Sequence, residues 1–170
     1  RARFRCGWTP TPRSVAAVEI TVRRGTAEDA PALARMRWRW RVEERQAAAG
    51  VDRSTFVDFF TSWVIDHLPT HLPFVVEVDG ALAGMAWLMV SDRVPAPGLM
   101  YRRTGDVQSV YVLPEHRNSG AGAKLMEAVL QEARDRELEF VTVHSSERAV
   151  TMYQRAGFAH NARWLEVRGR

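Results

Sequence analysis

The chain has 170 residues, of which 46% are hydrophobic and 26% are charged. This composition is typical of a soluble globular domain, and the length is enough to bury a core without disulfides or metals. We expect no membrane association, because no apolar run approaches the ~18 residues of a transmembrane helix, and the N-terminus lacks the apolar segment of a secretory signal.

The positive charge of the chain is concentrated near its N-terminus. The net charge is +4, and residues 1–17 contain four arginines and no acidic residue. Removing those four from the 24 basic residues leaves 20, which equals the number of acidic residues, 20. A neutral body argues against a nucleic-acid-binding protein. The single cysteine, Cys6, cannot form an intrachain disulfide, which fits a cytoplasmic location.

The first part of the chain predicts a leader, a strand and a helix. Residues 1–17 include two prolines and show no periodicity, so we expect a flexible basic leader before a single domain at 18–170. Alternating apolar and polar residues at 18–23 predict a strand. Thr26, with two acidic residues and a proline behind it, predicts the start of a helix over 27–46.

Part of that predicted helix is ambiguous. Residues 36–42 alternate apolar and charged side chains, which would also suit a strand. The capping residues and the length favour a helix, and a helix would place Leu33, Met36 and Trp40 on one face.

The rest of the chain mixes helical and strand patterns. In chain order, these patterns predict a helix at 55–67 capped by Ser54, strands at 74–78, 82–90 and 106–112, a helix at 120–136, a strand at 140–144, a helix from about 146 to 155, and one or two strands from Phe158 onward. Asp79-Gly80 joins two of these strands and is a strong hairpin signal. This order favours a mixed sheet with helices on both faces.

The stretch Arg117-Asn118-Ser119-Gly120-Ala121-Gly122 follows a strand and opens a helix. It is not a Rossmann fingerprint, because Leu125 occupies the place of the third glycine, and it is not a Walker A loop. The free N–H groups of a first helical turn, approached closely past glycines, would bind a phosphate. A helix start that simply needs flexible residues is the alternative, but the strand–turn–helix context favours phosphate binding.

Two motifs resemble the GNAT superfamily of acetyl-CoA-dependent N-acetyltransferases. Residues 110–122, VYVLPEHRNSGAG, look like the family's V-x-P-E-x-R-x-x-G-x-G, and residues 153–158, YQRAGF, look like its C-terminal Y-x-x-x-G-F. The matches cover about residues 107–158. The resemblance implies an α/β (α+β) fold with a mixed, mostly antiparallel central sheet of six to seven strands and about four helices on both faces.

The resemblance also implies how acetyl-CoA would bind. Main-chain groups of Val110 and Val112, on either side of Tyr111, would bind the pantetheine arm. The thioester would lie where the strands at 106–112 and 140–144 splay apart. The pyrophosphate would be held by Arg117, Asn118, Ser119, Gly120, Ala121, Gly122 and Ala123.

Tyr153 would face the sulfur and act as the general acid. A tyrosine is a sensible proton donor to a thiolate, because their unperturbed pKa values are about 10 and about 8.5. The alternative for Tyr153 is an aromatic ring packed on the core. Ser146 stands where many family members have an asparagine, and it would either hydrogen-bond the cofactor arm or only cap the following helix.

The sequence offers more than one candidate for the general base. Several family members have a glutamate where this chain has Gln108, which cannot accept a proton in its place. Asp106 lies two residues earlier, on the same strand face if no bulge intervenes, and is the candidate base. His144 and a water chain are the other candidates, and a neutral amine would need no base.

The acceptor site is predicted only in outline. Trp38, Gln108 and His144 are the candidate substrate contacts. Glu43 and Glu44 could attract a cationic amine, although exposed helix carboxylates are usually only solvated. Other aromatic residues of this region are predicted to be core, namely Phe59, Trp63 and Trp87.

The predicted activity is direct transfer of an acetyl group to a primary amine of a small molecule or peptide. No metal is expected, because the five histidines lack ligand spacing. A homodimer is consistent with the resemblance, since GNAT members are often dimers. The alternatives are a non-catalytic acyl-CoA-binding or regulatory domain, motivated by Gln108, and nucleic-acid binding through the leader and first helix, which the neutral body disfavours.

Overall fold

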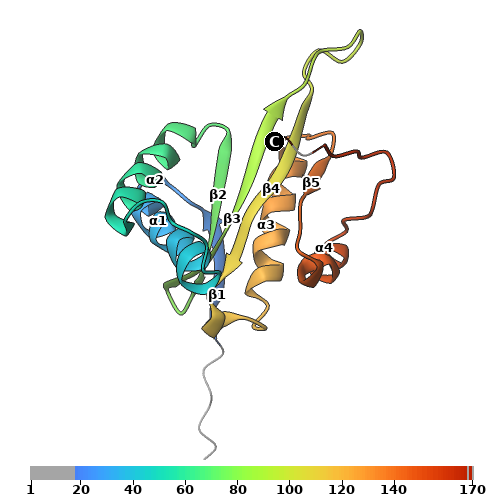
Figure 1. Cartoon of the computed structure of the whole chain (residues 1–170). Helices are drawn as coiled ribbons and strands as arrows, with labels where there is room; N and C mark the ends of the chain where they lie inside the picture. Colours follow the sequence, from blue (N-terminus) through green and yellow to red (C-terminus); the bar gives the residue numbers. More distant parts are fainter. Residues whose placement is uncertain (1–17, 168, 170) are drawn as a thin grey trace, which may run out of the picture.

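A twisted sheet of five strands runs through the middle of the molecule (Figure 1). The computed structural model of the chain describes residues 18–167 and 169, so the predicted leader lies outside the described residues. The first four strands pair antiparallel and the last pairs parallel to its neighbour, as the predicted mixed sheet requires. The sheet order follows the chain order: β1 (Ile20–Arg24), β2 (His71–Val78), β3 (Ala81–Asp92), β4 (Arg103–Val112) and β5 (Val141–Val143).

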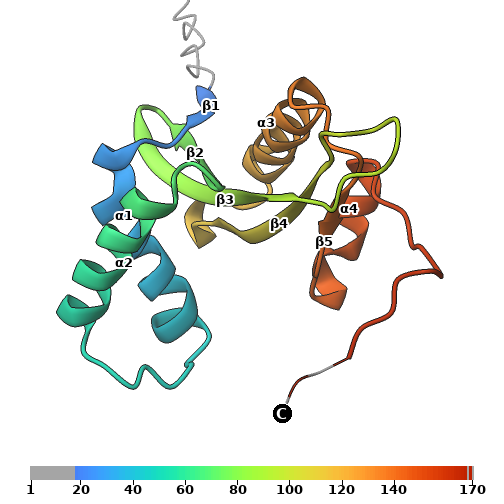
Figure 2. The ribbon, with the colours of Figure 1, turned by 90° about the horizontal axis from the view of Figure 1, so that it is seen from above.

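Helices cover both faces of the sheet, as the view from above in Figure 2 shows. Helices α1 (Ala30–Trp38) and α2 (Arg53–His67) lie on one face, and α3 (Ala121–Asp135) lies on the other. The short helix α4 (Val150–Arg155) packs its buried Tyr153 into the same core cluster as the buried face of α3. Each face therefore has its own core. None of the described helices combines the length and apolar character needed to cross a membrane.

The first predicted helix is confirmed, but it is not regular. A short 3₁₀ turn at Ala27–Asp29 precedes α1, and a wider π-helical turn at Arg39–Glu44 follows it. Leu33 and Met36 are buried as predicted, and the alternative of a strand at 36–42 is wrong. π-helical turns are rare in proteins, and those that occur are often found at functional sites.

The predicted hairpin is also confirmed. Asp79 and Gly80 have φ angles of 49° and 78°, which is the double left-handed conformation of a type I′ turn. The second helix begins earlier than predicted, at Arg53, because Asp52 rather than Ser54 is its cap. The Asp52 carboxylate accepts the Thr55 N–H at 3.0 Å.

Strand β4 contains a bulge at Ser109, where φ is 54°. Between the pairs Met85–Tyr111 and Trp87–Gln108, β4 contains one residue more than β3 does. The extra residue is visible in the sequence: Val107, Val110 and Val112 all pack toward the α3 core although a three-residue step interrupts their alternation.

The one or two strands predicted from Phe158 onward are not found, so the sheet has five strands rather than six or seven among the described residues. Aromatic contacts, not a hydrogen-bonded ladder, hold this segment. The Phe158 ring lies 5.5 Å from that of Tyr153, and the Trp164 ring lies 5.4 Å from that of Phe140. Some of the apolar residues that suggested strands therefore pack against other rings, and others, such as Leu165, are exposed.

Candidate functional site

The turn before α3 presents unpaired main-chain N–H groups. Gly120 caps the helix with a φ of 91°, which favours glycine, and Asn118 is also left-handed at 63°. The first main-chain bond of the helix runs from Lys124 N–H to the Gly120 carbonyl at 3.1 Å. Among the described residues, no acceptor faces the N–H groups of Gly122 and Ala123. This is the arrangement that binds an anion at a helix start.

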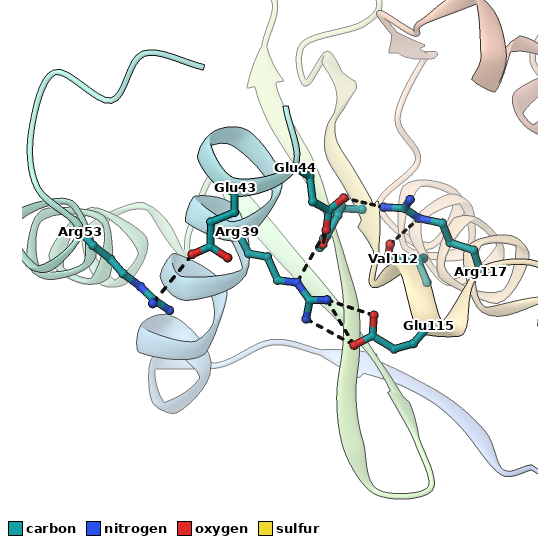
Figure 3. Close-up of polar contacts among 8 residues, drawn as sticks. Arg39, Glu43, Glu44, Arg53, Val112, Glu115 and Arg117 are labelled. Carbon is teal, nitrogen blue, oxygen red and sulfur yellow. Dashed lines mark hydrogen bonds and ion pairs between the residues drawn. The ribbon is translucent and has the colours of Figure 1, made fainter. Parts of the chain in front are cut away.

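Side chains around the turn are used differently. The Ser119 hydroxyl donates to the His116 carbonyl at 2.7 Å, so it shapes the turn itself. The Arg117 Nε donates to the Val112 carbonyl at 3.0 Å, and its Nη2 donates to Glu44 at 2.8 Å (Figure 3). Arg117 is thus held across the end of β4 with its guanidinium half exposed.

Glu44 is the centre of a polar network that links the π-helical turn to β4 and the turn before α3. Figure 3 shows it between Arg39 and Arg117. It also accepts the hydroxyl of Tyr111, whose pKa is raised by burial and by this bond. Arg39 in turn pairs with Glu115 at 3.1 Å. The expectation that Glu44 is merely solvated is wrong, because its carboxylate contacts Arg39, Arg117 and the Tyr111 hydroxyl.

The pairing of β4 with β5 stops early. Its last pair is Val107–Val143, although β4 continues to Val112. The bulge at Ser109 follows directly and changes the course of β4. Val110 and Val112 therefore lie on a stretch that has no partner strand on the β5 side among the described residues. Apart from the Val112 carbonyl, which accepts from Arg117, its main-chain groups on that side are left for an extended ligand.

A cavity of about 470 Å³ lies between β5, α4 and the C-terminal segment. It brings together three of the sequence-predicted residues, Asp106, His144 and Tyr153. Gln108, Trp38, Ser146 and the turn at 117–123 are not among its lining residues. The cavity thus brings the candidate acid together with both candidate bases.

Tyr153 packs in the core and also lines the cavity. Its ring is 7% exposed and packs in the α3 core, against Phe158. Its hydroxyl has no hydrogen-bond partner among the described residues, and the residue lines the cavity. Burial raises the pKa of Tyr153, because the phenolate would lose its hydration. The hydroxyl is therefore kept protonated and free to donate.

Asp106 is held firmly by two neighbours. Its Oδ1 accepts the Thr142 hydroxyl and its Oδ2 accepts the Gln108 amide, both at 2.9 Å. This confirms that Asp106 and Gln108 share a face, since the bulge comes after both. His144 differs, because its side chain is 85% exposed and its nearest acid, Glu166, is 4.0 Å away. Of the two candidate bases, Asp106 is therefore the one whose side chain is fixed by two hydrogen bonds.

The remaining predicted residues lie as follows. Ser146 is exposed and precedes the 3₁₀ turn at Glu147–Ala149, but its hydroxyl makes no capping bond. Trp38 is half-buried, with its ring 5.6 Å from that of Phe56 on α2. Trp87 is buried as predicted, whereas the prediction for Phe59 is wrong, since it is 67% exposed.

The sequence did not single out three residues that the structure places here. Thr142 holds Asp106, and Arg37 donates to the Ser109 hydroxyl at 2.7 Å. Only the bulge had a sequence signal, in the spacing of the β4 valines. Within the described residues, no three His, Cys, Asp or Glu side chains gather as a metal site.

Comparison with known proteins agrees with the resemblance seen in the sequence motifs. A sequence model of the Acetyltransferase (GNAT) family matches residues 32–158. The chain belongs to this family. An uncharacterized N-acetyltransferase from Archaeoglobus fulgidus is 34% identical over 67 residues, which is 36% of this chain and 40% of that relative.

Solved structures of the family share the fold across nearly the whole length of both chains. A predicted acetyltransferase from Clostridium acetobutylicum, crystallised with acetyl-CoA, superposes with a TM-score of 0.69 at 18% identity, covering 88% of this chain and 96% of that one. A GCN5-related N-acetyltransferase from Ralstonia eutropha JMP134 superposes with a TM-score of 0.65 at 26% identity, covering 88% and 98%.

Proposed function

We propose that this GNAT protein transfers an acetyl group from acetyl-CoA to a primary amine of a small molecule or peptide, by direct attack in a ternary complex. The observation that carries the proposal is the free, protonated Tyr153 hydroxyl on the cavity that also reaches Asp106. The crystal structure of the Clostridium acetobutylicum relative with acetyl-CoA supports the choice of donor.

The donor would bind along β4 and the turn that follows it. The N–H groups of Gly122 and Ala123 and the guanidinium of Arg117 suit the pyrophosphate, because all three are oriented donors near exposed turn residues. Main-chain groups of Val110 and Val112 would hydrogen-bond the pantetheine arm. Asn118, Ser119, Gly120, Ala121 and Ser146 complete the proposed donor site, with Tyr111 between the two valines.

The acceptor would approach from the face covered by α1 and α2, on which Asp106 and Gln108 lie. The amine nitrogen attacks the thioester carbon, the carbon–sulfur bond breaks, and the leaving thiolate takes the proton of Tyr153. Asp106 would receive the proton that the amine loses. Thr142 and Gln108 would orient this carboxylate, since each donates to one of its oxygens.

A thiol-release assay tests the proposal. Purified protein is incubated with acetyl-CoA and a panel of primary amines, and we expect free thiol only when both substrates are present. Tyr153→Phe should lower kcat at least ten-fold and leave CoA affinity within two-fold, because the ring still packs while the proton donor is gone. Tyr101→Phe is the control, since that side chain is 94% exposed on the β3–β4 loop.

The assay also separates the proposal from its rival. Tight CoA binding without turnover of any amine would overturn it in favour of a non-catalytic acyl-CoA-binding domain.

A further inference from the structure

Arg37, the penultimate residue of α1, is a half-buried arginine with no counter-ion among the described residues. Its side chain reaches β4, where Nη1 donates to the Ser109 hydroxyl at 2.7 Å. Its guanidinium carbon lies 5.0 Å from the ring centroid of Trp40. In the part of the chain that the structure describes, Arg37 forms no ion pair within 4.0 Å. The hydroxyl of Ser109 is the single side-chain acceptor that it has there.

Neighbouring arginines do have acidic ion-pair partners, which makes Arg37 unusual. Arg39 and Arg117, which reach the same side of β4, pair with Glu115 and Glu44. For Arg37, burial and the nearby positive charge of Arg41 both lower the pKa. Buried charges in proteins are normally paired, because a desolvated ion without a partner costs free energy. An arginine kept in this state suits an anion that the protein itself does not supply.

The position of Arg37 points to the acceptor rather than the donor. Ser109 follows Gln108 and Asp106 on β4, two residues past the last β4–β5 pair at Val107. The donor-binding turn lies at the other end, where Arg117 and the N–H groups of α3 serve it. The guanidinium of Arg37 therefore meets β4 one residue beyond Gln108, on the face covered by α1 and α2.

We propose that Arg37 binds a carboxylate of the acceptor, so that the substrates are primary amines carrying a carboxylate, such as amino acids. This inference rests on the proposed acetyl transfer. The planar guanidinium has five N–H donors and matches a carboxylate with two parallel bonds. The Ser109 hydroxyl accepts from Arg37 and keeps its own proton to donate to the same anion. Trp40 supports the plane of the guanidinium from one side.

Matched acceptor pairs test the proposal. Each amino acid is compared with its C-terminal amide, which retains the amine but removes the negative charge. We expect at least a ten-fold higher kcat/KM for the acid, mainly through KM. Arg37→Met should abolish that preference, and Arg37→Lys should retain part of it. Arg35→Met is the control, because Arg35 is an exposed arginine on the same helix and its loss should leave the preference unchanged.

A structural role for Arg37 would give another result. If Arg37 only held the bulge of β4, Arg37→Met would lower the melting temperature and depress both members of each pair equally. We expect instead an unchanged or higher melting temperature, since the variant removes an unpaired desolvated charge. A preference for O-phosphoethanolamine over ethanolamine, without any for the acids, would overturn the carboxylate assignment.

The two proposals can fail separately. Turnover of acids and amides at equal rates would overturn only the role of Arg37. Absence of all turnover would overturn acetyl transfer, and the role of Arg37 is then decided by the melting temperature of the CoA-saturated protein with the same compounds. A rise with acids that Arg37→Met abolishes supports the carboxylate site, and the lack of such a rise overturns it.

Discussion

Glu44 and Arg117 meet through a 2.8 Å hydrogen bond although 73 positions separate them in the chain. The contact joins the π-helical turn after α1 to the turn before α3. Since Glu44 also accepts the buried Tyr111 hydroxyl, one carboxylate holds together the acceptor side and the donor side of the proposed site.

Replacing Glu44 should therefore destabilise the protein more than replacing its neighbour. Glu44→Ala leaves the Tyr111 hydroxyl without its acceptor, and we expect a loss of about 1–3 kcal/mol in the free energy of unfolding. Glu43→Ala is the matched control, with an expected change below about 0.5 kcal/mol, because its pair with Arg53 is long at 3.8 Å and about half exposed. Urea denaturation measures both.

A double-mutant cycle refines this prediction. In a Tyr111→Phe background the penalty of Glu44→Ala should shrink, because no hydroxyl is left unsatisfied. Equal penalties for the two glutamates in the parent protein would show that the network does not contribute to stability.

Arg117 should matter for binding of the donor. Arg117→Ala is expected to weaken CoA binding about ten-fold, or about 1.4 kcal/mol, and to reduce the salt dependence of the dissociation constant. Calorimetry at two ionic strengths measures both effects. Arg134→Ala serves as the control, since that exposed arginine lies at the opposite end of α3. An effect of the same size from Arg134 would exclude a local contact with the pyrophosphate.

The two glycines of the turn should behave differently. Gly120→Ala is strained whatever the space around it, because φ is 91°, and it should cost about 1–2 kcal/mol of stability. Gly122→Ala should leave stability unchanged, since the new Cβ would meet Met152 and Val112 at ordinary distances of 3.7 and 3.9 Å. If a pyrophosphate approaches this backbone, Gly122→Ala should still weaken CoA binding. Unchanged CoA affinity would place the ligand elsewhere.

Asp29 should dominate the acid sensitivity of the fold. It is 8% exposed, and its carboxylate accepts from Arg23 at 2.8 and 2.9 Å and from the Thr26 N–H at 2.8 Å. These bonds lower its pKa, led by the one to Arg23. The stabilisation is therefore present above the ordinary carboxyl pKa of about 4 and is lost as pH falls through the lowered value in the folded protein.

Asp29→Asn should accordingly destabilise the protein by about 1–3 kcal/mol at pH 7, and less at pH 3. Glu28→Gln, next to it but exposed, should have no effect at either pH. Unfolding curves of the three proteins at the two pH values test this. A penalty that stays constant between pH 7 and pH 3 would contradict the role of the ionised carboxylate.

Local signals in the sequence determined most of the secondary structure and the family. The Asp79-Gly80 turn, the apolar face of α3 and the left-handed Gly120 each depend on residues only a few positions apart. The motifs at 110–122 and 153–158 are likewise contiguous, so the segment that we propose binds the donor could be identified without the fold. The lack of strands among the described residues after Phe158 could not be predicted, because whether an alternating segment joins a sheet depends on the edge that it meets.

The tertiary structure decided which side chains share a site. Arg37 reaches Ser109 across 72 positions, and Asp106 meets Thr142 across 36. No local periodicity encodes such partners, because the energy of an ion pair or a hydrogen bond depends on distance in space and not along the chain. The sequence by itself determined the kind of fold and the family, from which acetyl-CoA is proposed as the donor. Only the packing of α1 and the π-helical turn against β4 revealed that Arg37, which contacts β4 at Ser109, has no ion-pair partner among the described residues.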